Sequence, residues 1–424
     1  MHRTFTQHGF RYVEVSGLGA PLAMTQVEAI EMHTAISQVS AVSTSLPMLN
    51  AIQHATLWGQ KSNIMSVPTD CPNRDERRGW TGDASLTAEE ALYNYGMGAI
   101  YTRWLDEIVD DQTADGSVNN FVPSLGEGDG APNWQSAYPS IIWGLYMYYG
   151  DTTIVTRHYS SLSKYYDHLE ANFNASAGLT NYVTGFGDWV PAGPMGNKHL
   201  IGSFALLADL QKGADFFGAS SHPDGAGRAQ RCKDLFAKAA ADFHRAFFNA
   251  TMGYYGTGLQ TEQAMPLYLG IVPAGVLPAV ISHTISDIEV THQKHTTSGI
   301  IGIKAMLDAL TAAGRTDVAL DMLMQVECQP PVPHPIHLHP YNHARLLAPL
   351  PPALPPAPPP PITILISAHG PGHIPQLRLH AQGRRGRLGT GDYSMGALGL
   401  GLAGTEHEQP QPHHVRDRLS LVLP

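Results

Sequence analysis

Ten stretches with helical periodicity are the feature that most constrains the fold of this chain of 424 residues. In each of them apolar residues recur every three to four positions, the spacing that gives a helix one buried face. They cover residues 48–62, 84–112, 136–149, 152–173, 197–217, 226–248, 262–270, 274–288, 297–313 and 315–326. Loops rich in Gly, Asp, Asn and Pro separate them, and strand patterns are almost absent. The pattern predicts an all-α barrel or toroid of paired helices, whose loops at one end build a site.

Composition narrows the class of protein further. A hydrophobic content of 43% can bury at least one large core, and the length predicts two or three domains. The net charge of −10 argues against a nucleic-acid partner. No segment reaches about 18 uninterrupted apolar residues, so we expect no membrane partner either. Met1–Ala20 lacks the pattern of a secretory signal, and the localisation stays undetermined.

Cysteine and histidine give no metal or cofactor pattern. Cys71, Cys232 and Cys328 are an odd, widely spaced set that fits neither a disulfide framework nor a ligand motif. Four histidines cluster within residues 334–343, but the prolines among them do not fix imidazoles in a tetrahedron. We therefore expect no metal and no cofactor.

The stretch Val67–Asp83 concentrates charge in a way that no other segment does. It holds four carboxylates, three arginines and one tryptophan: Asp70, Asp75, Glu76, Asp83, Arg74, Arg77, Arg78 and Trp80. Two prolines and two glycines predict a shaped loop rather than a helix, since proline lacks the N–H donor and glycine weakens the helical state. The helical pattern that begins at Ala84 then places these groups just before a helix N-terminus.

The chemistry of this loop suits carbohydrate. A carboxyl crowded by other carboxylates and an aromatic ring holds its proton to higher pH, and such a group can act as a general acid. An arginine offers a planar fork of donors to ring hydroxyls, and a tryptophan covers the apolar face of a sugar. The alternative interpretation is a charge-balanced loop that only joins two helices.

The string Pro68-Thr-Asp-Cys-Pro-Asn-Arg-Asp-Glu-Arg-Arg-Gly-Trp-Thr-Gly-Asp83 resembles the signature of bacterial and fungal-type α-L-rhamnosidases. These are inverting glycoside hydrolases with an (α/α)6 catalytic barrel, also called six-hairpin glycosidases. The resemblance implies that Glu76 is the general acid, that Asp70, Arg74 and Asp83 hold sugar hydroxyls, and that Trp80 walls the pocket. Arg78 departs from the family, which usually carries a leucine-like residue there.

Two more loops, at residues 119–134 and 185–190, carry aromatic and acidic residues that suit a sugar pocket. In rhamnosidases comparable loops supply tryptophans around the rhamnose, and by this resemblance Trp134 and Trp189 bind substrate; each could equally pack a loop. Asp188 either binds a hydroxyl or caps a turn. Glu127 and Asp129, on a glycine-rich loop, are expected to be solvated.

The sequence divides into three parts. Residues 1–35 contain a short strand-like run, Phe10–Val15, which resembles the end of the β-sandwich domain that precedes the barrel in rhamnosidases. Residues 36–328 carry the barrel, which lacks two helices of a complete set of six hairpins. Residues 329–424 hold 19 of the 32 prolines and no Phe or Trp, so we expect a disordered, low-complexity tail.

The general base is not recognisable. An inverting hydrolase needs a second carboxylate to activate water, and the family's base would fall in the Pro-rich tail. Glu262 and Glu327 are candidates, but neither lies in the family's context, so the base stays unassigned. One hypothesis is that the tail reflects a shifted reading frame or a mispredicted splice; the rival is a genuine proline-rich linker or partner-binding tail.

The predicted function is hydrolysis of terminal non-reducing α-L-rhamnose with inversion, on a rhamnose-containing glycoside or polysaccharide. Two alternatives remain. One is a sugar-binding or inactive chain without the base, and the other is an exo-acting (α/α)6 glycosidase for a different sugar.

Overall fold

The computed structural model describes residues 7–10, 15, 23–126, 130–173 and 185–326. The predicted strand run at residues 10–15 and the tail fall largely or wholly outside these ranges. The helices, apart from a 3₁₀ turn at Met24–Gln26 and a π-helical turn at Asp287–Thr291, are α1 Pro47–Ser62, α2 Thr81–Asn94, α3 Gly98–Asp110, α4 Pro132–Gln135, α5 Ala137–Tyr149, α6 Thr153–Arg157, α7 Tyr159–Ala171, α8 Lys198–Ala219, α9 Gly225–Phe247, α10 Gln260–Tyr268, α11 Leu277–Ser286, α12 Ile300–Ala312 and α13 Thr316–Leu323. Two short antiparallel hairpins join β1 Ile64–Met65 to β2 Val67–Pro68 and β3 Phe248–Asn249 to β4 Tyr254–Tyr255.

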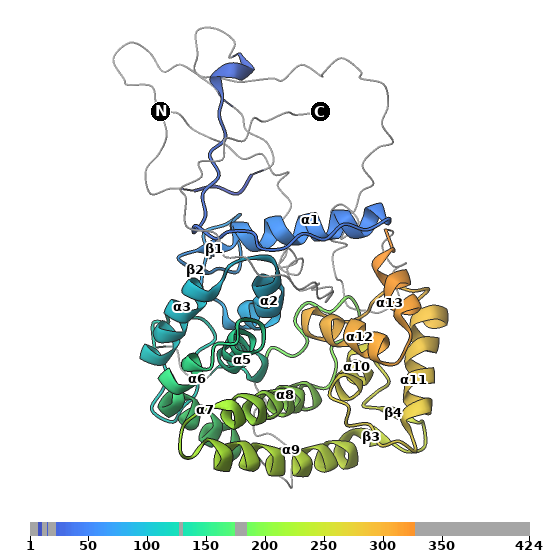
Figure 1. Ribbon diagram of the computed structural model, residues 1–424. Helices are drawn as coiled ribbons and strands as arrows, with labels where there is room; N and C mark the ends of the chain where they lie inside the picture. The colour runs from blue at the N-terminus through green and yellow to red at the C-terminus, as the bar shows by residue number, and fades with distance from the viewer. Residues whose placement is uncertain (1–6, 11–14, 16–22, 127–129, 174–184, 327–424) are drawn as a thin grey trace.

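The helices form a double-layered ring (Figure 1). Among the described residues, five inner helices pack in sequence around it, α2 on α5, α5 on α8, α8 on α10 and α10 on α12, and α12 returns to α2. Outer helices cover them: α3 packs on α5, α7 and α9 on α8, α11 on α10, and α13 on α12. This arrangement confirms the predicted all-α barrel of paired helices.

Two of the predicted helices are in fact broken. The segment predicted at 84–112 is interrupted at Tyr95, whose backbone is extended and bridges to Gln38, so that inner helix α2 ends and outer helix α3 begins. The segment predicted at 152–173 is interrupted at His158, between α6 and α7. In both places tertiary contacts override a continuous apolar pattern, since His158 is buried and Tyr95 is 3% exposed.

The start of α2 also differs from the prediction. The helix begins at Thr81, so Gly82 and Asp83 lie in its first turn and not in the preceding loop. Trp80 has extended backbone and precedes the helix, while Thr81 donates its N–H to the carbonyl of Asn120 over 2.9 Å. A carboxylate in a first turn is favoured by the helix dipole, which explains why Asp83 fits there.

The core consists of two clusters of buried side chains, and the partly buried Phe173 and Phe236 pack against both. Trp104 and Tyr138 are fully buried between the first helices, and Phe243 and Met265 are fully buried between the later ones. Burying an aromatic side chain stabilises the folded state by about 2 kcal/mol or more. The helices that carry the site are therefore fixed by packing on both sides. Within the described residues, no helix is both long and apolar enough to cross a membrane.

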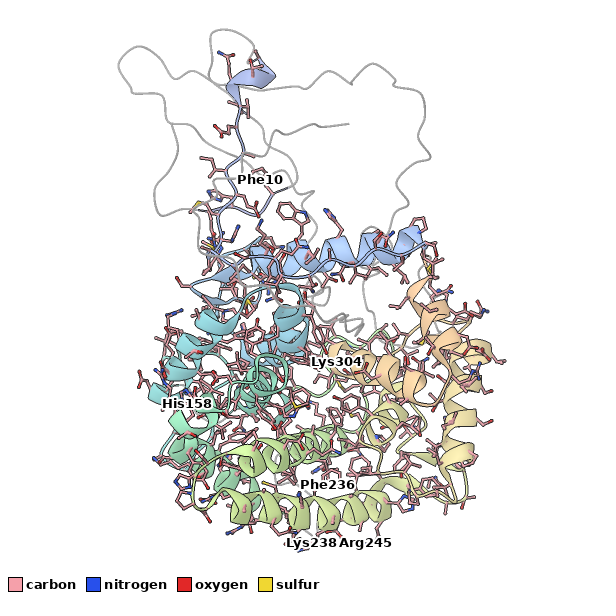
Figure 2. All side chains as sticks on the ribbon, viewed as in Figure 1. Phe10, His158, Phe236, Lys238, Arg245 and Lys304 are labelled. Carbon is pink, nitrogen blue, oxygen red and sulfur yellow. The ribbon has the colours of Figure 1, made fainter. Side chains whose placement is uncertain are left out.

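A cavity of about 440 Å³ lies inside the ring, lined by residues of the inner helices that include Glu89, Phe204 and Tyr268. Lys304 of α12 lies where that helix faces α2 (Figure 2), and its Nζ donates to Glu89 Oε2 over 2.9 Å. This ion pair joins the last inner helix to the first and so closes the described ring.

Candidate functional site

The loop from Asp70 to Arg78 closes on itself. The N–H of Arg78 donates to Asp70 Oδ1 over 2.8 Å, and the N–H of Asp70 donates to the carbonyl of Arg78 over 3.1 Å. Arg77 ties the loop from outside, because its Nη2 donates to the carbonyls of Gln7 and Pro72. The intervening residues, Glu76 among them, are held at the tip of a fixed turn.

Glu76 is held by two donors from its own loop. The indole Nε1 of Trp80 donates to Oε1 over 2.8 Å, and Arg74 donates Nε to Oε2 over 2.9 Å and adds a second contact through Nη2. The Glu76 side chain is 32% exposed. Glu76 is not among the residues that line the cavity inside the ring.

Asp70 is buried beside Glu76. One carboxylate oxygen of each lies within 4.8 Å of the other and of the Cys71 thiol. Asp70 Oδ2 is buried and forms an ion pair with Arg74, whose Nη2 lies 3.8 Å away, and the Cys71 side chain is hydrogen-bonded to the Asp70 carboxyl. Burial raises the pKa of Asp70, and the negative charge of Glu76 adds to this.

Asp83 completes the acidic cluster. Burial, followed by the negative charge of Asp70, raises the pKa of Asp83 to about 7. The crowded carboxyls that the sequence predicts are thus present, and the raised pKa values belong to Asp70 and Asp83.

The three predicted tryptophans come together, although they derive from three separate loops. Their common contact is Phe186, whose ring centroid lies 6.1 Å from Trp80, 4.6 Å from Trp134 and 5.6 Å from Trp189. Phe121 packs edge-on against Trp80 at 5.3 Å. Sequence reasoning missed both phenylalanines as site residues. The available signal was their place in the same loops as Trp134 and Trp189.

The two glycines of the signature are required by close approaches. A Cβ on Gly82 would lie 2.3 Å from the Trp134 ring, so this indole lies flat against the first turn of α2. A Cβ on Gly79 would lie 2.0 Å from the carbonyl oxygen of Val122, because Trp80 and Phe121 form a β-bridge there. Both glycines therefore serve packing, and the prediction that Gly82 prevents a helix is wrong.

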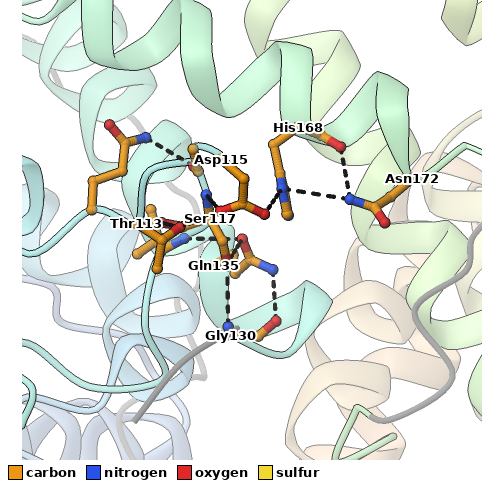
Figure 3. A network of polar contacts seen from close by, with 10 residues as sticks. Thr113, Asp115, Ser117, Gly130, Gln135, His168 and Asn172 are labelled. Atoms are coloured by element: carbon orange, nitrogen blue, oxygen red, sulfur yellow. Dashed lines mark hydrogen bonds and ion pairs between the residues drawn. The ribbon is translucent and has the colours of Figure 1, made fainter. Parts of the chain in front are cut away.

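A polar network fixes the loop that leads to Trp134 (Figure 3). Gln135 accepts from the N–H of Val118 over 3.1 Å and donates to the carbonyl of Gly130 over 2.6 Å. Asp115, in the turn before this loop, lies 3.0 Å from Nδ1 of the buried His168 on α7. A hydrogen bond from Thr113 and the nearby His168 hold the pKa of Asp115 below its usual value. The loop is thus anchored to two helices.

Two acidic side chains that the sequence leaves as candidates have structural partners. Asp188 is 1% exposed and accepts the N–H groups of Gly299, Ile301 and Gly302 over 2.7–3.0 Å, so it caps the N-terminus of α12. Glu262 is fully buried and accepts the N–H groups of Asn197 and Thr257. The carboxylate oxygens of both residues accept from backbone N–H groups, so neither is placed to take a proton from a water molecule. The remaining acidic candidates, Glu127, Asp129 and Glu327, lie outside the described residues.

The only described grouping with the spacing of a metal site is Asp70, Cys71 and Glu76. Arg74 forms ion pairs with both carboxylates and already supplies positive charge there. Burial raises the pKa of Cys71 to about 11, which disfavours the thiolate that a metal needs. This arrangement fits a hydrogen-bonded sugar better than a cation.

Comparison with known proteins identifies the family of the chain. Residues 37–330 match the model of the bacterial α-L-rhamnosidase six-hairpin glycosidase domain. An α-L-rhamnosidase of Streptomyces avermitilis is 34% identical over 325 residues, which are 76% of this chain and 30% of that protein. The chain thus spans about a third of the length of the curated relatives it matches.

Solved structures show the same relationship. An α-L-rhamnosidase from Dictyoglumus thermophilum superimposes with a TM-score of 0.64 at 32% identity, over 69% of this chain and 33% of the other. The Streptomyces avermitilis enzyme complexed with L-rhamnose gives 0.64 at 30% identity, over 70% and 28%. The resemblance read from residues 68–83 therefore extends over the whole ring, and the chain belongs to the bacterial α-L-rhamnosidase six-hairpin glycosidase domain family.

Proposed function

We propose that this protein hydrolyses terminal, non-reducing α-L-rhamnose from glycosides or polysaccharides with inversion, and that Glu76 is the general acid. The observation that carries the proposal is the position of the Glu76 carboxylate. It is fixed by Trp80 and Arg74 beside the buried Asp70, and it is open to an incoming glycosidic oxygen. The family's curated members named above are called α-L-rhamnosidases, which supports the same substrate class.

The sugar would lie against the aromatic cluster of Trp80, Trp134 and Trp189. Rhamnose carries a methyl group at C6 and an apolar ring face, and both suit indole surfaces. Its hydroxyls would bind Asp70, Arg74 and Asp83, and the Trp134 ring would wall the site beside the first turn of α2.

In the proposed reaction Arg74 and Trp80 hold the Glu76 carboxyl in place beside the bound sugar. Water attacks the anomeric carbon from the opposite face and gives a proton to a base that stays unassigned, while the bond to the glycosidic oxygen breaks and this oxygen takes the proton of Glu76.

A second candidate function is sugar binding without turnover. It is favoured by the state of Glu262, since this candidate base is fully occupied by backbone donors. Rhamnose binding can be followed by tryptophan fluorescence, and turnover by NMR of an α-L-rhamnoside. Turnover that first releases β-L-rhamnose supports the inverting enzyme. Release of the α-anomer refutes inversion, and binding without release supports the second candidate.

A further inference from the structure

Arg77, the residue that follows Glu76, has a backbone conformation that is rare for a residue with a side chain. Its φ is 44°, in the left-handed region that glycine adopts readily and other residues seldom do. A residue keeps such a conformation only where its surroundings hold it there. The turn at Arg77 sets the direction in which the chain leaves Glu76, so the contacts that hold Arg77 also act on the position of the Glu76 carboxyl.

Contacts to two separate parts of the chain hold Arg77. Within the loop, its backbone is hydrogen-bonded to the Cys71 thiol, and its Nη2 donates to the carbonyl of Pro72 over 3.3 Å. The same Nη2 donates to the carbonyl of Gln7 over 2.7 Å, and Gln7 lies 70 residues earlier in the chain. The Arg77 Nε is buried. The guanidinium is therefore enclosed where the loop meets the N-terminal segment.

This N-terminal segment, residues 7–10, lies directly against the loop, and we call it the arm. A Cβ on Gly9 would lie 2.8 Å from the Cα of Asn73 and 3.0 Å from the carbonyl oxygen of Pro72. Glycine at position 9 thus lets the two backbones approach more closely than a side chain would permit. The arm touches the loop at Asn73 and at Arg77, which flank Glu76 in the sequence.

The placement of a general acid decides its effect on the rate. A proton is transferred only when the acid lies within hydrogen-bond reach of the oxygen that accepts it, and a shift of about 1 Å can cost about a hundredfold in rate. Trp80 and Arg74 hold the Glu76 carboxylate by its oxygens. Arg77 and the arm hold the backbone that carries it, so the two sets of contacts complement each other.

We propose that Arg77 is a positioning residue for the general acid and that the arm anchors it through the carbonyl of Gln7. This inference rests on the proposed function, because it needs Glu76 to donate the proton. Arg77 acts through the placement of Glu76 and contacts neither the sugar nor the reacting oxygen. Loss of the anchor should therefore leave rhamnose binding largely intact and slow the step that needs the proton.

The test measures kcat and KM on two substrates that differ in their need for an acid. A rhamnosyl disaccharide has a poor leaving group, whereas p-nitrophenyl α-L-rhamnoside has a good one. Arg77→Met removes the donors of the side chain, Arg77→Lys keeps a cation, and Gly9→Ala pushes the arm away from the loop. Arg77→Met is also made in the Glu76→Gln protein, which has no proton to place.

Two matched controls lie away from the loop. Arg228→Met removes a partly buried arginine of α9 that also donates to a backbone carbonyl, that of Ser163, over 3.2 Å. Gly275→Ala adds a methyl group that meets no atom within 4 Å. Thermal unfolding checks that each variant is folded, and if Arg77→Met does not fold, Gly9→Ala and Arg77→Lys carry the same comparison.

Arg77→Met should lower kcat on the disaccharide by about tenfold to a hundredfold, with KM little changed and a much smaller loss on the p-nitrophenyl substrate. Gly9→Ala should act in the same direction, and Arg77→Lys should recover part of the rate. In the Glu76→Gln protein Arg77→Met should lower the rate no further. Arg228→Met and Gly275→Ala should leave the ratio of the two rates unchanged.

Three results would overturn the inference alone: equal losses on both substrates, no loss on the disaccharide, or a loss of the same size in the Glu76→Gln protein. Each would mean that Arg77 does not act through Glu76. An unmodified protein that cleaves neither substrate, or a disaccharide rate that survives Glu76→Gln, would overturn the proposed function and the inference with it.

Discussion

The indole N–H of Trp80 donates a 2.8 Å hydrogen bond to the carboxylate of Glu76, four residues earlier in the chain. This bond joins the acidic turn to the aromatic cluster, because the same indole packs against Phe121 and Phe186. The proposed proton donor and the proposed sugar-binding surface are thereby fixed relative to each other by a single side chain.

Trp80→Phe should lower kcat/KM on an α-L-rhamnoside by about tenfold or more. The substitution keeps an aromatic ring and removes the donor, and a hydrogen bond to a charged group contributes about 1.5–3 kcal/mol. Trp58→Phe is the control, since Trp58 on α1 makes the same kind of bond to His54 in an exposed position. Similar rates for the two variants would show that the Trp80–Glu76 bond is unimportant for turnover.

Gly82→Ala should destabilise the protein by about 1–3 kcal/mol, because the new methyl group would overlap the Trp134 ring. Urea unfolding measures the effect, and reduced rhamnose binding should accompany it. Gly59→Ala in α1 meets no atom within 4 Å, and it should stabilise by about 0.5–1 kcal/mol through helix propensity. If Gly82→Ala left the free energy of unfolding unchanged, the position of the Trp134 ring would not depend on its close approach to Gly82.

Stability should fall as the pH rises from about 5 to 8, because of Glu90. Burial raises the pKa of Glu90 to about 8, and the side-chain amide of Asn94 donates to its carboxyl. A glutamic acid in the unfolded chain titrates near about 4.3, so between that pH and about 8 only the folded chain holds this proton. The stabilisation is complete below this window, and each pH unit within it lowers the free energy of unfolding by about 1.4 kcal/mol, on the order of 5 kcal/mol in all.

Glu90→Gln tests whether the protein loses stability, through Glu90, as the pH rises. The amide is neutral at every pH and can still accept from Asn94, so the variant should be the more stable protein at pH 8.5 and should depend less on pH between 5 and 8. Urea unfolding at the two pH values measures the difference. A variant that follows the same pH dependence as the unmodified protein would contradict a protonated, buried Glu90.

Much of this architecture could be predicted from the sequence. Apolar residues recur every three to four positions, which indicates that one face of each helix is buried. Residues 68–83 form a signature long enough to identify the family. The breaks at Tyr95 and His158 were missed because the apolar pattern continues through them, and it is tertiary contacts that end the helices. The role of Asp188 was left open for a similar reason, since its partners Gly299, Ile301 and Gly302 lie more than a hundred residues away in the chain.

The site was only partly predictable. The acids and tryptophans follow from the family resemblance, whereas Phe186 and Phe121 are recognised only when their contacts are seen. The need for glycine at position 82 likewise becomes clear only from its contact with the Trp134 ring, which comes from another segment of the chain. The general base stays unassigned, since Glu262 is occupied by backbone donors.

The central claim is that Glu76 protonates the leaving group, and its most direct test is the effect of Glu76→Gln on two rhamnosides. An acid matters most when the leaving group is poor, so a rhamnosyl disaccharide should lose about a hundredfold to ten-thousandfold in kcat/KM, and p-nitrophenyl α-L-rhamnoside should lose much less. Asp75→Asn, at the neighbouring exposed carboxylate, should change neither rate. Equal losses on both substrates, or no loss on the disaccharide, would contradict the assignment of Glu76 as the general acid.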